Sequence, residues 1–249
     1  MTIRKRRVRR VRNIPFNKIV PNMITSGSVL CGMFSLMLTY RGHFLPSAFV
    51  LVIAVFFDYM DGRVARSIGG SSAFGEELDS LADALSFGAA PAFLMYARYI
   101  DIGVGTLATL GTAFFALCGV LRLARFNVMH VAGNFQGLPI PAAGMVLASI
   151  VIADIPLTPY AAVAVMVLLG GLMISTVPYG NLKLLRRGNV NKLKAAILMG
   201  IAVSCCAALK EKALLALICV YIVSGPLRFD WGAWLSRSQR EDERPSMEK

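Results

Sequence analysis

The sequence predicts an all-α integral membrane protein, a polytopic bundle of about eight transmembrane helices. Hydrophobic residues make up 56% of the 249-residue chain, only 16% of residues are charged, and the mean hydropathy is +0.63. This composition lies far from that of an ordinary soluble domain. Apolar runs long enough to cross a hydrocarbon core of about 30 Å recur along the chain, at residues 23–40, 45–61, 79–98, 103–121, 140–156, 159–177, 193–209 and 212–228.

The distribution of cationic residues tests this helix count, because each added helix moves the following loop to the other side of the membrane. With the N-terminus in the cytoplasm, 22 of the 26 Lys and Arg residues fall on the inner side. The outer side keeps only Arg41, Arg98, Lys210 and Lys212. This asymmetry agrees with the positive-inside rule. We therefore expect both termini in the cytoplasm and the chain in the cytoplasmic (inner) membrane.

The sequence divides into three parts. Residues 1–20 form a basic juxtamembrane segment with eight Lys and Arg residues. Such a segment could bind nucleic acid, but one that continues directly into a membrane helix is better explained by contact with anionic lipid headgroups. Residues 21–230 form the membrane-embedded domain, and residues 231–249 form a polar tail of mixed charge that we expect to be disordered. Membrane lipids are therefore predicted partners, and nucleic acid is not.

Four aspartates stand at or near the ends of two apolar runs, where charge is normally excluded. Asp58 and Asp61 are three residues apart and Asp79 and Asp83 are four apart, so on two helices each pair projects from one face. A carboxylate at a helix centre costs roughly 2.5 to 3.5 kcal/mol. Glycines and serines between residues 62 and 75 favour a turn, which would make the two helices antiparallel neighbours with converging acidic faces.

Converging carboxylates describe a divalent cation site. Hard oxygen donors suit Mg²⁺ or Mn²⁺, and two such ions would balance four carboxylates in formal charge. The alternative, that the acids simply surround a solvated loop, fits Glu76 and Glu77 but not the two regularly spaced pairs. The sequence therefore predicts two divalent ions near the cytoplasmic side of the second and third spans.

The stretch from Asp58 to Asp83 reads D-x2-D-G-x2-A-R-x8-G-x3-D-x3-D. It resembles, at eight positions and without a gap, the signature of the CDP-alcohol phosphotransferase family of integral membrane enzymes. The resemblance implies a six-helix catalytic core, a homodimer, and transfer of a phosphatidyl group to an alcohol with release of CMP. It also implies that Asp58, Asp61 and Asp79 are the main metal ligands and that Asp83 is the general base. The sequence alone does not separate base from ligand, and Asp83 could also contact the second ion.

A nucleotide-binding set is implied by the same resemblance. Small residues would let a nucleotide approach the helix backbone closely, and Arg66 can donate to phosphate in a fork geometry. Pro21 suits a helix start. Asn22 and Thr25, which follow it, are explained as well by a helix cap and a tolerated polar side chain as by contacts to the nucleotide. The polar contact of the family's loop falls most naturally to Ser72. The predicted nucleotide-binding residues are Asn22, Thr25, Asp61, Gly62, Ala65, Arg66, Ser72 and Gly75.

The residues after the signature indicate the acceptor. The continuation S-L-A-D-x-x-S-F-G-x-A-P-A from Ser80, with RLARFNV and GNFQGLPIPAAG further on, resembles the membrane-integral phosphatidylserine synthases. This implies CDP-diacylglycerol and L-serine as substrates. Arg122, Arg125 and Asn127 are candidates for binding the serine or a lipid phosphate, although arginines at this end of a span are also ordinary anchors. The two prolines of GLPIP either shape a pocket rim or simply begin the fifth span.

Two alternatives stay open at this point. An acceptor with its own phosphate, such as glycerol 3-phosphate or inositol phosphate, would want a denser cationic pocket than Arg122 and Arg125 provide. A divalent cation transporter would also place acids within the membrane. Against transport, the acids do not continue outward, because Asp101 and Asp154 lie in predicted loops on the far side.

Overall fold

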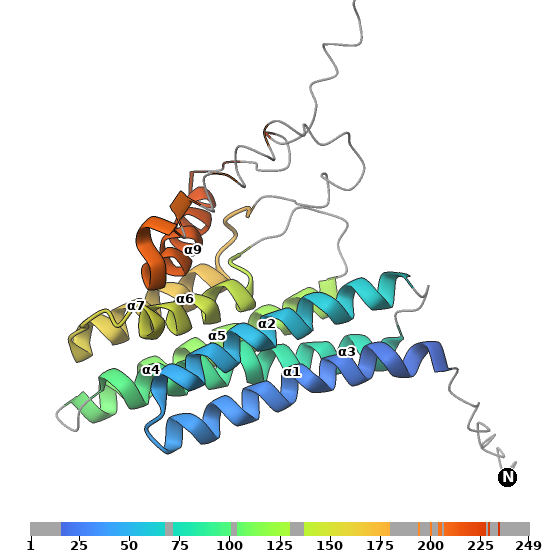
Figure 1. Ribbon diagram of the computed structural model, residues 1–249, viewed down its shortest axis with the longest axis horizontal. Coiled ribbons are helices and arrows are strands. Elements are labelled where there is room, and N and C mark those ends of the chain that lie inside the picture. The colour runs from blue at the N-terminus through green and yellow to red at the C-terminus, as the bar shows by residue number, and fades with distance from the viewer. Residues whose placement is uncertain are drawn as a thin grey trace, which may run out of the picture.

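The computed structural model describes residues 16–67, 72–100, 104–129, 137–179 and 207–227, together with Lys194, Gly200, Ser204, Cys205, Phe229 and Trp234. These residues form helices joined by short loops, without a β-strand, and the helices lie side by side in a bundle (Figure 1). The predicted all-α class is therefore confirmed for the described part of the chain. Most of the predicted span 193–209, and nearly all of both terminal segments, lie outside it. The total of eight spans stays a prediction.

The first two helices form an antiparallel hairpin. Helix α1 covers Phe16–Tyr40 and α2 covers Phe44–Ser67. Between them Gly42 takes a φ of +78°, the left-handed conformation in which α-helices commonly end. Deeper in the hairpin, the buried hydroxyl of Ser47 lies 2.8 Å from the Ser35 hydroxyl. Because an unsatisfied hydroxyl is costly in apolar surroundings, this pair stabilises one register of α1 on α2.

Two predicted helix boundaries are wrong. Helix α1 begins at Phe16, so Pro21 lies inside the helix and not at its start. The ring is tolerated because its fixed φ suits a helix and because only one intrahelical hydrogen bond is lost near the helix end. Helix α2 continues past Gly62 to Ser67, and the next helix begins at Ala73, so the predicted break between the helices falls inside the 62–75 stretch but not at Gly62. A lone glycine costs only about 1 kcal/mol relative to alanine, which is too little to end a helix that packs along α1.

The third predicted span consists of three consecutive helical pieces. Helix α3, Ala73–Asp83, continues into the π-helical turn η1, Ala84–Ala89, and then into α4, Ala90–Tyr99. Within η1 the buried Ser86 hydroxyl donates to a backbone carbonyl of α1 at 2.8 Å. Pro91 follows in the first turn of α4 and has no N–H to donate, and the wide π turn accommodates its ring. The backbone next to Asp83 is therefore not a regular α-helix.

The remaining helices complete the bundle. They are α5, Gly105–Met129, α6, Ile140–Ile152, α7, Pro159–Ile174, and α9, Ala213–Ser224, which follows the short 3₁₀ turn η4, Lys210–Lys212. In α6, 11 of the 13 residues are buried, so this helix lies in the interior. Helix α9 packs against α6, as Figure 1 shows in orange beside yellow.

The outer surface of the bundle is that of a protein in lipid. Three helices are long and apolar enough to cross a membrane, over Ile19–Tyr40, Phe44–Ser67 and Gly105–Val128. Large hydrophobic side chains on them face outward, among them Leu30, Phe34, Phe49, Ile53, Phe56, Leu110 and Leu117. A soluble monomer rarely exposes apolar patches of this extent. The chain is an integral membrane protein.

Candidate active site

Three of the four signature aspartates meet at one point of the bundle. Asp58 and Asp61 come from the last turns of α2, and Asp79 comes from α3. Each offers a carboxylate oxygen, and these oxygens all lie within 4.8 Å of one another. The i, i+3 spacing on α2 turns both of its aspartates toward the same neighbour. The structure therefore brings together the three residues that the signature implied as main metal ligands.

Asp83, one helical turn beyond Asp79, stands beside this group. Its carboxylate lies within hydrogen-bonding reach of the Asp58 carboxylate. It is not one of the three residues whose oxygens meet within 4.8 Å. Arg122 of α5 is the cation that faces Asp83. Asp83 thus borders the cluster on one side and a guanidinium on the other.

The donor set fits a divalent cation. One oxygen of Asp61 and one of Asp83 are buried without a hydrogen-bond partner among the described residues. A buried carboxylate oxygen without a partner is strongly unfavourable, and a bound cation would satisfy it. All the donors are carboxylate oxygens, which are the ligands that Mg²⁺ and Mn²⁺ prefer.

A cavity of about 200 Å³ opens next to the cluster, between the first turns of α1, the last turns of α2 and the start of α3. All eight predicted nucleotide-binding residues line it, although they come from three separate segments of the chain. Its complete lining consists of Pro21, Asn22, Thr25, Asp61, Gly62, Ala65, Arg66, Ser72, Gly75, Glu76 and Asp79.

The glycines around this cavity have different local roles. A Cβ on Gly75 would lie 2.9 Å from the side-chain oxygen of Asn22, so glycine lets the start of α3 approach α1. A Cβ on Gly62 would meet nothing nearer than the Arg66 guanidinium, at 3.4 Å. Gly62 therefore leaves the wall of the cavity open, whereas Gly75 permits helix packing.

Two polar residues of the cavity also hold local structure. Ser72 is the N-cap of α3, where its hydroxyl accepts a hydrogen bond from the Gly75 N–H at 3.0 Å. Thr25 is buried and donates its hydroxyl to the Pro21 carbonyl at 3.0 Å, and it also lies within hydrogen-bonding reach of Asp61. Ser72 is therefore a helix cap that faces the cavity, a role that its position in the loop did not reveal.

The three candidate acceptor residues on α5 do not converge. Arg122 faces Asp83. Arg125 donates to the carbonyls of Ile174 and Ser175, at 3.0 and 3.4 Å, and so caps the end of α7. Asn127 donates to the Ser80 hydroxyl at 3.0 Å and joins α5 to α3. Of the three, Arg122 is the one with an interaction with a signature aspartate recorded among the described residues.

Two tyrosines near Arg122 were not predicted. Tyr221 of α9 lies within electrostatic range of the Arg122 guanidinium. Tyr179, which follows α7, packs its ring on that of Tyr221 with 5.7 Å between ring centroids. Neither residue belongs to a motif, and they are more than 50 residues from Arg122 along the chain. Only the folded bundle places them near the site.

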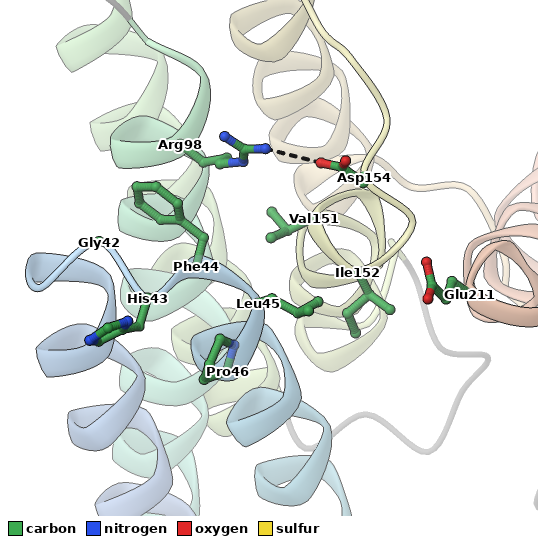
Figure 2. A pocket seen from close by; sticks show the side chains of 10 residues that line it. All are labelled: Gly42, His43, Phe44, Leu45, Pro46, Arg98, Val151, Ile152, Asp154 and Glu211. Carbon is green, nitrogen blue, oxygen red and sulfur yellow. Dashed lines mark hydrogen bonds and ion pairs between the residues drawn. The ribbon is translucent and has the colours of Figure 1, made fainter.

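A larger cavity, of about 530 Å³, lies at the opposite end of the bundle. Figure 2 shows its lining, with Arg98 paired to Asp154 at 3.0 Å and Phe44 beneath the guanidinium. From Phe44 to Asp58, α2 rises by roughly 20 Å, so the two cavities are well separated. None of the predicted site residues lines the larger one. We place the candidate active site at the smaller cavity, because Asp61 and Asp79 of the aspartate cluster line it.

The fold and the site define a membrane-embedded helical protein whose acidic cluster borders a cavity at one end of the bundle. The sequence profile of the CDP-alcohol phosphatidyltransferase family matches residues 18–226. This chain belongs to the CDP-alcohol phosphatidyltransferase family, and it is therefore a transferase.

Several known proteins are similar along most of the chain. A CDP-diacylglycerol–serine O-phosphatidyltransferase of Helicobacter pylori is 33% identical over 227 residues, which cover 87% of this chain and 94% of the relative. An archaetidylserine synthase of Methanothermobacter thermautotrophicus is 38% identical over 168 residues, which cover 64% of this chain and 69% of the relative. Among solved structures, a phosphatidylinositol phosphate synthase of Mycobacterium tuberculosis in complex with manganese and citrate has a TM-score of 0.49 and 25% identity, covering 63% of this chain and 78% of its own.

Proposed function

We propose that this chain is a phosphatidylserine synthase, which transfers the phosphatidyl group of CDP-diacylglycerol to the hydroxyl of L-serine and releases CMP. The observation that carries the proposal is that the nucleotide-binding residues of the family signature line one cavity and that two members of the aspartate cluster, Asp61 and Asp79, form part of its wall. The choice of serine is supported by the relatives named as serine transferases, such as the 33% identical protein of Helicobacter pylori. Those names favour serine over glycerol 3-phosphate or inositol phosphate.

Two divalent ions, Mg²⁺ or Mn²⁺, belong to this proposal. Asp58, Asp61 and Asp79 would hold them, and Asp83 would complete the set from the side of Asp58. When bound, the ions would offset the charge of the diphosphate and of the phosphoryl group during transfer. The unpartnered oxygens of Asp61 and Asp83 support this assignment.

The residues that line the cavity bind the cytidine diphosphate group in this proposal. Gly62 and Ala65 present minimal side chains, so the cytidine diphosphate can lie against α2. Arg66 donates to its phosphates, and Asn22, Thr25 and Ser72 offer polar contacts on the facing walls.

Asp83 accepts the proton of the serine hydroxyl as general base. The serine oxygen forms a bond to the phosphorus that carries the diacylglycerol, and the bond from that phosphorus to the CMP oxygen breaks. The Asp83 carboxylate takes the proton, and Arg122 beside it balances the negative charge.

Charge also supports an orientation in the membrane. The aspartate end of the bundle carries Arg63, Arg66, Arg122 and Arg125 and lies on the side to which the sequence assigns 22 Lys and Arg residues, against four on the opposite side, Arg41, Arg98, Lys210 and Lys212. By the positive-inside rule the active site faces the cytoplasm across the inner membrane, with both termini on that side. In this arrangement residues 1–20 contact anionic lipid, residues 21–230 form the catalytic domain, and residues 231–249 form a cytoplasmic tail. The chain acts as a homodimer, as the family resemblance implies.

CMP release by the purified full-length protein tests the proposal. The assay contains CDP-diacylglycerol in detergent, Mn²⁺ or Mg²⁺, and either L-serine, glycerol 3-phosphate or inositol phosphate. We expect release with serine alone, and none with Asp83→Asn. Glu77→Gln, which removes an exposed carboxylate from the same helix, should behave like the wild type. Release with another acceptor would overturn the choice of serine. If none of the three acceptors causes CMP release, and liposomes containing the protein take up Mn²⁺, the chain would instead be a transporter.

A further inference from the structure

Two buried polar groups beside the active site have no partner in the described part of the chain. One is the Nε–H of Arg122 and the other is the hydroxyl of Tyr179. Tyr179 is only 1% exposed. A buried donor without an acceptor costs about 1 to 3 kcal/mol, so each of these two donors indicates that an acceptor group is missing beside it.

Tyr221 connects these two groups. It lies within electrostatic range of Arg122 on one side and of Tyr179 on the other. The Tyr179 ring also packs directly on the end of α9, where a Cβ on Gly225 would collide with it. Arg122 of α5, Tyr221 of α9 and Tyr179 after α7 are therefore a row of neighbouring donor side chains, which we call the polar wall.

The donor groups of this wall suit a carboxylate. A guanidinium and phenol hydroxyls all offer N–H or O–H donors, and a carboxylate can accept from several donors at once. Arg122 also faces Asp83. The Arg122 end of the wall therefore lies next to the proposed general base.

We propose that Tyr221 and Tyr179, together with Arg122, bind the carboxylate of the acceptor amino acid. The inference rests on the proposed function and extends its site onto α9, beyond the family signature. In serine the hydroxyl and the carboxylate are only a few bonds apart. A carboxylate held by the Arg122 guanidinium and the two phenol hydroxyls therefore leaves the hydroxyl within reach of Asp83, which removes its proton.

Variants that lack only one hydroxyl test this inference. The KM for L-serine and the KM for CDP-diacylglycerol are measured for Tyr221→Phe and for Tyr179→Phe, in the full-length protein with Mn²⁺. Tyr160→Phe is the matched control, because Tyr160 is 65% exposed at the start of α7. Ethanolamine serves as a second acceptor, since it has the hydroxyl and the amine of serine but no carboxylate. The apparent Tm of each variant reports whether it is folded.

We expect the KM for serine to rise about tenfold in each of the two variants, as for loss of one hydrogen bond to a charged group. The KM for CDP-diacylglycerol and the turnover of ethanolamine should stay at the wild-type values, so the preference for serine over ethanolamine falls. Tyr160→Phe should change neither. An unchanged KM for serine, or equal losses with serine and ethanolamine, would overturn the inference. If the wild type itself does not use serine but uses another acceptor, the proposed function fails instead.

Discussion

Removing one carboxylate of the aspartate cluster should stabilise the protein without metal and weaken its response to divalent cations. Asp58, Asp61 and Asp79 each place an oxygen within 4.8 Å of the other two. At an effective dielectric constant of about 20, two full charges at this distance repel one another by about 3.5 kcal/mol. The variant Asp79→Asn keeps the shape of the side chain and removes two of the three repulsive pairs, about 7 kcal/mol when all are ionised.

Proton uptake relieves part of this repulsion when no cation is bound. We therefore expect a net gain of about 1 to 2 kcal/mol in the free energy of unfolding, which corresponds to a rise of about 2 to 8 °C in Tm for a chain of this size. Adding Mn²⁺ should stabilise the wild type more than the variant, because the variant has lost one metal ligand.

Thermal unfolding of the purified protein in detergent measures both quantities, once in EDTA and once in Mn²⁺. The control is Glu77→Gln, which removes the same charge from an exposed position of α3 outside the cluster. It should unfold like the wild type in both conditions. The reasoning is refuted if Asp79→Asn unfolds at a lower temperature than the wild type in EDTA, or if Mn²⁺ stabilises the two proteins equally.

Three further substitutions test the packing around the site. Arg125→Met removes the donors to the carbonyls at the end of α7 and should cost about 1 kcal/mol, seen as a lower Tm with an unchanged KM for serine; the opposite pattern would support acceptor binding by Arg125. Ser86→Ala removes a buried hydrogen bond to α1, so a loss of about 1 kcal/mol in unfolding free energy is expected, and an unaltered Tm would contradict it. Gly137→Ala places a side chain at a φ of +80° and against carbonyl oxygens at the end of α7. Of the three substitutions it should lower the Tm the most, with a loss of at least about 1 kcal/mol in the free energy of unfolding. A wild-type Tm would show that the turn relaxes.

The aspartate cluster could be predicted from the sequence because its geometry depends on local helical spacing. Residues three or four apart share one face of a helix whatever surrounds them, so Asp58 and Asp61 had to project together. The glycines and serines between residues 62 and 75 then predicted a turn, and with it the pairing of this helix with that of Asp79. The open cavity wall at Gly62 could also be predicted, because the absence of a side chain there follows from the identity of the residue alone.

Features that depend on distant segments could not be predicted. The π turn after Asp83 packs against α1 and α6, and no residue in Ala84–Ala89 predicts it. The guanidinium of Arg125 is used by the end of α7, which is about 50 residues further along the chain. Tyr221 reaches Arg122 only because α9 packs on α6. In each case the partner is chosen by packing, which the local pattern of residues does not contain.

The π-helical turn η1 also adjusts the phase between two halves of one span. Helix α3 packs on α1, whereas α4 packs on both α1 and α6, and the extra width of Ala84–Ala89 lets both halves fit. Deleting a single residue there would turn one half relative to the other by about 100°. Either the acid cluster or the packing of α4 would then be lost. The length of this stretch is therefore constrained as strongly as its chemistry, although none of its side chains contacts the substrate in the proposed mechanism.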